Sequence, residues 1–168
     1  MKRCLLVLFA VLITAVSHAQ GSDADEGDAS ADMMIGAGVS NEGVAYGGCV
    51  EMNAFGITLG ARGSIHGGSW GFSNHSVKEF GILAGYGCSK ESFSISVTGG
   101  YSLTSFKCIS PAGYNCEDYR QGSYAGLTAQ IKMTRRFSER TGLGFLGFGN
   151  FNRHGDLYGA MLMFDIAI

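Results

Sequence analysis

The chain has 168 residues, 46% hydrophobic and 15% charged, with a formal net charge of −2, a length that fits one domain. Glycine supplies 27 residues, more than twice its usual share of about 7%, and glycine is costly inside helices, which argues against a helical bundle. The near-neutral charge, without a basic cluster, argues against a nucleic-acid partner, because binding phosphates requires clustered Lys and Arg.

Residues 1–19 have the pattern of an export signal. A positively charged start precedes an apolar run over residues 4–16, and Ser17 and Ala19 are the small residues of a cleavage site. A run of 13 residues is shorter than the roughly 20 that a membrane-spanning helix needs. We therefore expect export, with Gln20 as the first residue of the mature chain.

Residues 20–32 carry five acidic side chains and no large apolar one, so they predict a flexible acidic leader. From residue 33 to residue 168, apolar and polar residues alternate, which is the period of a β-strand. The alternation is clearest between Phe93 and Thr104, where Ser and Thr separate the apolar residues. Turn signals divide this domain into eight expected strands, at 33–40, 44–52, 54–65, 77–89, 92–106, 120–136, 141–152 and 156–168.

The composition of the two strand faces indicates which face meets solvent. The polar face consists mostly of Ser, Thr and Gly, small groups that fit inside an eight-stranded barrel, whereas a soluble surface would be rich in Lys and Glu. We expect the apolar face to point outward into lipid, and the sheet to close because lipid does not tolerate open edges. The predicted fold is all-β, an eight-stranded antiparallel up-and-down transmembrane barrel, with strands that span roughly 25 Å.

The whole pattern resembles the small outer-membrane barrels of the OmpA and OmpX type. The resemblance rests on the export signal, the eight strands, the alternation of tight turns with longer loops, and aromatic residues near strand ends: Phe55, Phe80, Phe93, Phe106, Phe137, Phe151 and Tyr158. The chain departs from that type at its last residue, which is Ile168 and not the usual Phe.

The resemblance implies a place in the outer membrane of a Gram-negative bacterium, contact with outer-membrane lipids and insertion by the barrel assembly machinery. It also implies that the tight turns are periplasmic and that the longer loops face outward. We expect a monomer without a cofactor or a bound metal, because no Cys or His spacing typical of a metal site occurs.

Five charged residues fall on the polar face and are expected inside the barrel: Glu51, Arg62, Glu79, Lys132 and Asp165. Arg62 and Glu79, on adjacent strands, form the best expected ion pair and lie toward the outer end. The other three are expected nearer the periplasmic end. The set predicts a structural plug of ion pairs, and a gated ion path is the alternative.

Two long loops, 67–75 and 107–119, are expected to carry contacts with a ligand outside the cell. Their aromatic residues Trp70, Phe72, Tyr114 and Tyr119 are the expected contacts.

The four cysteines of the mature chain fall into two classes. Cys108 and Cys116 flank a short segment of the second long loop, and export leads to an oxidising compartment, so a disulfide is expected between them. Cys49 and Cys88 are expected on opposite faces of strands two apart, beyond the reach of a disulfide, and therefore free.

Three functions are compatible with the sequence. The first is a non-enzymatic outer-membrane barrel with a packed polar lumen. The second is a barrel that hydrolyses lipid A, for which His66, His75 or His154, with Asp156, could serve together with loop serines, although no catalytic signature surrounds them. The third is a secreted soluble barrel that binds a small ligand inside.

Overall fold

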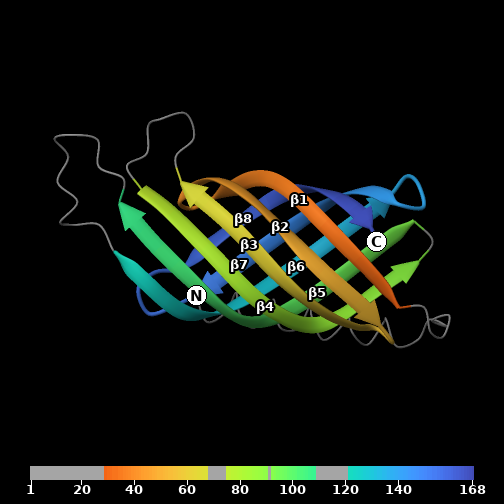
Figure 1. Cartoon of the computed structure of the whole chain (residues 1–168), viewed down its shortest axis with the longest axis horizontal. Coiled ribbons are helices and arrows are strands. Elements are labelled where there is room, and N and C mark those ends of the chain that lie inside the picture. Colours follow the sequence, from red (N-terminus) through yellow and green to blue (C-terminus); the bar gives the residue numbers. More distant parts are fainter. Residues whose placement is uncertain (1–28, 68–74, 91, 109–120) are drawn as a thin grey trace, which may run out of the picture.

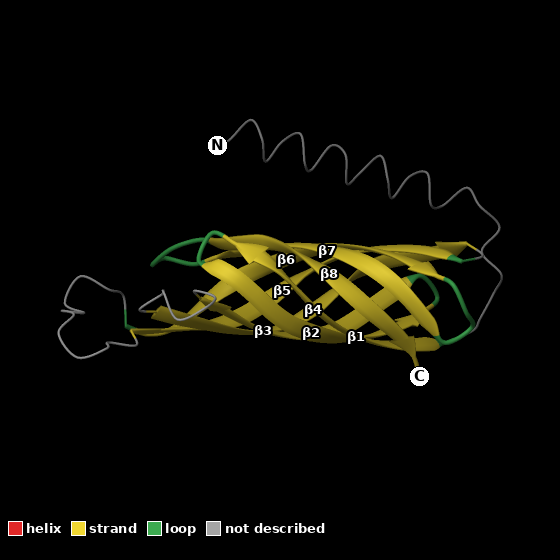
Figure 2. Cartoon of the chain, turned by 90° about the horizontal axis from the view of Figure 1, so that it is seen from above, coloured by secondary structure: helices red, strands yellow, loops and turns green. Residues whose placement is uncertain are grey.

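A computed structural model describes residues 29–67, 75–90, 92–108 and 121–168. Eight antiparallel strands follow one another around a closed barrel, and β1 pairs with β8 to complete it. Figures 1 and 2 show a single layer of strands that run obliquely around the long axis. The strands are β1 (Ser30–Ser40), β2 (Gly43–Ala54), β3 (Ile57–Gly67), β4 (His75–Lys90), β5 (Phe93–Cys108), β6 (Gly122–Arg136), β7 (Thr141–Phe151) and β8 (Leu157–Ala167).

The predicted fold class is confirmed, and most strand bounds lie within two residues of expectation. The first strand differs more, because β1 begins at Ser30 and not at residue 33. Asp32, expected in the acidic leader, is therefore a barrel residue that pairs with Glu51 of β2 and is buried. The described residues contain no helix that is long and apolar enough to span a membrane.

The turn between β2 and β3 also differs from the prediction. Phe55 and Gly56 were expected within a strand that began at residue 54, but they form the turn between Ala54 and Ile57. Both have positive φ, 53° at Phe55 and 74° at Gly56, as in a type I′ hairpin turn. Phenylalanine is unusual at such a φ, and that is why residue preference did not reveal the turn.

The two faces of the sheet have the expected orientation. Large apolar side chains cover the outside, among them Ile35, Tyr46, Leu59, Ile82, Tyr101, Leu127 and Leu162. At the end of the barrel where β1 begins and β8 ends, short turns connect the successive strands (Figure 2). An apolar belt on a closed sheet suits a lipid environment, because every strand edge is paired.

The inside of the barrel is less polar than predicted. One group of buried interior residues is apolar: Met34, Ala45, Cys49, Val77, Phe106, Leu146, Phe148, Leu157, Met161 and Met163. Phe106, expected among the aromatic residues near the lipid boundary, belongs to this group because strand alternation turns it inward. The lumen therefore has an apolar part and an ionic part, and the expected polar lining describes only the ionic part.

Closure between β1 and β8 brings two backbones together at Gly38. A Cβ at this position would lie 1.9 Å from the carbonyl oxygen of Ala160, a contact that only backbone movement could relieve. Gly38→Ala should therefore lower the free energy of unfolding by about 1–3 kcal/mol. Gly63→Ala is the matched control, because nothing lies within 4 Å of the added Cβ. Urea unfolding in lipid vesicles checks this, and equal losses for both variants would contradict the close approach at the β1–β8 seam.

Candidate functional site

The ionic part of the lumen is the most organised polar site in the described residues. Glu51, Arg62, Glu79, Lys132 and Asp165 are all buried, each no more than 4% exposed. Alternation along the strands places them there, since residues two apart on a strand share a face. Asp32 on β1 and Arg136 on β6 join them, so three cations meet four carboxylates.

Arg62 and Glu79 form the central ion pair. Nη2 of Arg62 donates a hydrogen bond of 2.6 Å to Oε1 of Glu79, and both side chains are fully buried. The same guanidinium donates to Thr128 Oγ1 at 2.8 Å and to Gln130 Oε1 at 3.1 Å, both on β6 across the lumen. The Phe148 ring lies 4.9 Å from the guanidinium carbon, in a cation–π arrangement. Arg62 thus connects β3 with β4, β6 and β7.

Glu79 accepts further hydrogen bonds around the pair. Asn150 Nδ2 donates to Oε1 at 3.1 Å, and the Ser64 hydroxyl donates to Oε2 at 3.3 Å. Asn150 also donates to Thr104 Oγ1 at 2.7 Å. A buried carboxylate needs such donors to offset its lost hydration, so Glu79 is held in one position by several strands.

Gln130 links the Arg62 pair to a second group of charges. Its Oε1 accepts from Arg62, while its Nε2 donates to Glu51 Oε1 at 2.6 Å. Glu51 Oε2 in turn lies 2.6 Å from Lys132 Nζ. One hydrogen-bonded chain therefore runs from Glu79 to Lys132 along the lumen.

The second group of charges lies toward the end of the barrel where β1 begins and β8 ends. Lys132 Nζ is 3.9 Å from Asp32 Oδ2, and Arg136 forms an ion pair with Asp32. Nε of Arg136 lies 3.4 Å from Asp165 Oδ2. These contacts join β1, β6 and β8 inside the barrel, near the start of β1 and the end of β8.

Sequence analysis did not include Asp32, Arg136, Gln130 or Asn150 in this site. Asp32 was assigned to the leader by composition, although it alternates correctly with Met34 on the inward face. Arg136 shares its face with Lys132, so the period of two could have revealed it. The amides of Gln130 and Asn150 carry no such signal, because neutral residues on a polar face are common.

Of the histidines proposed for hydrolysis, His66 is not arranged as in a catalytic triad. His66 was considered a loop residue but lies on β3, fully buried in the lumen, with Nε2 2.7 Å from the Ser64 hydroxyl. Glu79 lies 3.9 Å from that same ring nitrogen, so the imidazole does not bridge a serine and a carboxylate as in a catalytic triad. His154 stacks on Tyr124, with ring centroids 3.8 Å apart. His75 begins β4, and Asp156 precedes β8.

The remaining expected site residues have different outcomes. Trp70, Phe72, Tyr114, Tyr119 and Cys116 lie outside the described residues. Cys49 is buried in the lumen and Cys88 is exposed, and both are free, as expected. Cys108 ends β5 and is not among the free thiols, while its pairing with Cys116 stays a prediction. Within the described ranges, no group of three or more His, Cys, Asp and Glu side chains is placed to hold a metal ion.

The structure is a closed eight-stranded antiparallel β-barrel with an ion-paired lumen, and it is similar in fold to the barrels of known outer-membrane proteins. The N-terminal barrel domain of OprF from Pseudomonas aeruginosa superposes with a TM-score of 0.65 at 11% identity, covering 85% of this chain and 100% of that one. Ail from Yersinia pestis, the attachment invasion locus protein, in complex with the heparin analogue sucrose octasulfate, superposes with a TM-score of 0.56 at 13% identity, covering 85% and 99%. No protein-family model and no curated protein sequence matches the chain. These likenesses establish the fold.

Proposed function

We propose that this chain is a non-enzymatic outer-membrane barrel of a Gram-negative bacterium, with a lumen closed by its own side chains. The observation that carries the proposal is the combination of an apolar outer surface with the buried chain of ion pairs from Glu79 to Lys132. An eight-stranded barrel has an interior that side chains can fill, so the ion pairs act as a structural plug and not as a pore.

The plug supports an envelope role in which the barrel is a rigid base for its outer loops. The strand ends that flank loops 67–75 and 107–119 lie at the end of the barrel opposite the start of β1 and the end of β8. We propose that Trp70, Phe72, Tyr114 and Tyr119 contact a ligand outside the cell, and that a Cys108–Cys116 disulfide holds the base of the second loop. Loops on a rigid scaffold are where binding residues concentrate. Outer-membrane lipids and the barrel assembly machinery are the proposed partners in the envelope, with the chain as a monomer.

Electrophoresis of washed outer membranes, boiled and unboiled, tests this proposal. The full chain, expressed in a Gram-negative host, should stay in the membrane pellet and migrate differently before and after boiling, because the closed barrel resists detergent. Omitting reductant should shift the boiled band if Cys108 and Cys116 are joined. A protein that remains in the periplasmic supernatant, with the same migration before and after boiling, would contradict the membrane barrel. It would favour a soluble barrel with a ligand inside.

A further inference from the structure

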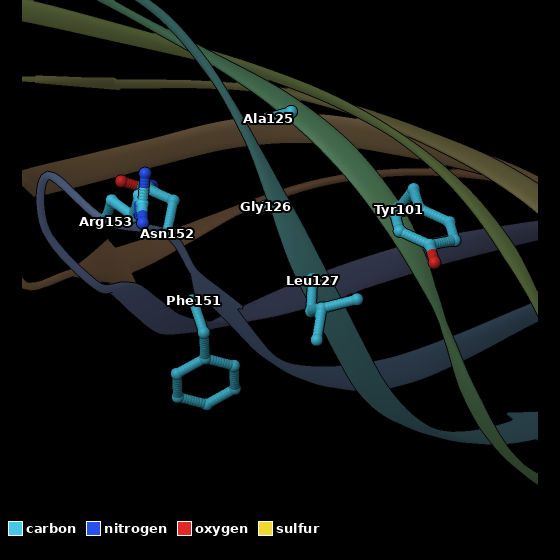
Figure 3. A pocket seen from close by; sticks show the side chains of 7 residues that line it. All are labelled: Tyr101, Ala125, Gly126, Leu127, Phe151, Asn152 and Arg153. Atoms are coloured by element: carbon cyan, nitrogen blue, oxygen red, sulfur yellow. The ribbon is translucent and has the colours of Figure 1, made fainter.

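A shallow groove of about 520 Å³ lies on the outside of the barrel, over β5, β6 and β7. Figure 3 shows its lining side chains, which come from three successive strands and the turn after β7. Tyr101, Leu127 and Phe151 supply its apolar surface, and each is about half exposed or more. The lining residues are Tyr101, Ala125, Gly126, Leu127, Phe151, Asn152 and Arg153.

The groove lies where the ladder between β6 and β7 ends. The ladder between β6 and β7 ends at the pair Leu127 and Phe151, whereas β5 and β6 stay paired as far as Phe106 and Gly122. Beyond the last pair, Ala125 faces outward into the groove with a small side chain, whereas Gly126 faces the lumen, where an added Cβ would lie 2.6 Å from Oδ1 of the buried Asn150. The hollow is therefore a product of the backbone and of small residues.

The groove joins an apolar surface to one cationic residue, Arg153. Arg153 lies in the turn after β7, at the end with the long loops, and makes no ion pair within the described part of the chain. Lys78 on β4 and Lys107 on β5 are also exposed at this end. Phe151 ends β7, and Tyr101 and Leu127 lie within β5 and β6, so Arg153 in the following turn faces the lipid headgroups if the barrel spans the membrane.

We infer that this groove binds the phosphorylated lipid of the outer leaflet, lipid A, with an acyl chain along Tyr101, Leu127 and Phe151 and a phosphate at Arg153. The inference rests on the proposed outer-membrane location and adds a ligand and a site to it. An arginine fork donates paired hydrogen bonds to phosphate oxygens, which a lysine cannot do in the same geometry. The apolar part requires a chain, so a free phosphate would use only half of the site.

Binding of purified lipid A to the refolded full chain in neutral detergent, measured by native mass spectrometry, tests the site. Arg153→Ala should weaken binding about ten- to a hundredfold, the effect of losing a charge-assisted hydrogen bond. Ala125→Trp should weaken it by a similar factor, because the indole would fill the groove without changing the charge. Lipid A without its phosphates should bind wild type as weakly as phosphorylated lipid A binds Arg153→Ala.

Arg140→Ala is the matched control, since it removes an exposed arginine from the turn at the opposite end. It should leave the affinity for lipid A unchanged. Equal losses for Arg153→Ala and Arg140→Ala, or no effect of Ala125→Trp, would overturn the site. The shift in migration on boiling is recorded for each variant. If the wild type shows no shift on boiling, the barrel proposal itself is contradicted. If the wild type shows the shift but Arg153→Ala leaves the affinity for lipid A unchanged, only the lipid site is contradicted.

Discussion

Arg62→Ala should lower the free energy of unfolding by about 3–5 kcal/mol, the cost of leaving a buried charge without its partner. Glu79 would keep Asn150 and Ser64 as donors but would lose the guanidinium that lies 2.6 Å away. Gln130 and Thr128 would lose their donor as well. The measurement is the fraction of unboiled protein that keeps the folded migration as the urea concentration rises, in lipid vesicles.

The double variant Arg62→Ala with Glu79→Ala should be more stable than Arg62→Ala alone. Removing both partners leaves a cavity but no unpaired charge, and the charge is the larger cost. Glu79→Gln alone is the reciprocal control, since it leaves Arg62 unpaired while keeping the shape. Equal losses for the single and double variants would contradict a pair that is energetically coupled.

Ile82→Arg should destabilise the barrel in a lipid bilayer by about 2–4 kcal/mol, the cost of a cation at the midplane of a transmembrane barrel. Ile82 is 65% exposed, on the outer face near the middle of β4, and it pairs with Ala61 and Tyr101 on the adjacent strands. A guanidinium there would lie in hydrocarbon, away from the water that normally solvates it. Urea unfolding in phospholipid vesicles measures the effect.

Ile57→Arg is the matched control, because Ile57 also faces outward but begins β3 beside the turn. Near the membrane interface the same substitution should cost about 0–1 kcal/mol. If both variants unfold at the urea concentration of wild type, the outer face does not contact lipid, and the apolar belt must be covered in another way.

The period of two along the strands made much of this molecule predictable. Sequence alternation assigned Arg62, Glu79 and Lys132 to the inner face, because a strand sends successive side chains to opposite sides. It failed at Phe55, where a residue that is usually found in strands forms a tight turn. It also missed Asp32, because the acidic composition of residues 20–32 was a stronger signal than the short alternation at the start of β1.

Other features depend on how the strands meet across the lumen. Gln130 of β6 reaches both Arg62 of β3 and Glu51 of β2, and none of these strands is its neighbour in the barrel. The stagger of the strands decides which residues stand at the same height inside the barrel, and it results from the pairing of all eight strands together. The apolar half of the lumen has the same origin, since Met161 and Phe148 pack with partners on other strands.

The sequence by itself determined the number of strands, their faces and the burial of five charged residues, because these follow from local alternation between turn signals. The tertiary structure decided which charges pair, that Gly38 must be small, and that a groove opens between β6 and β7. Each of these depends on the distance between residues far apart in the chain, and only the closed barrel sets those distances.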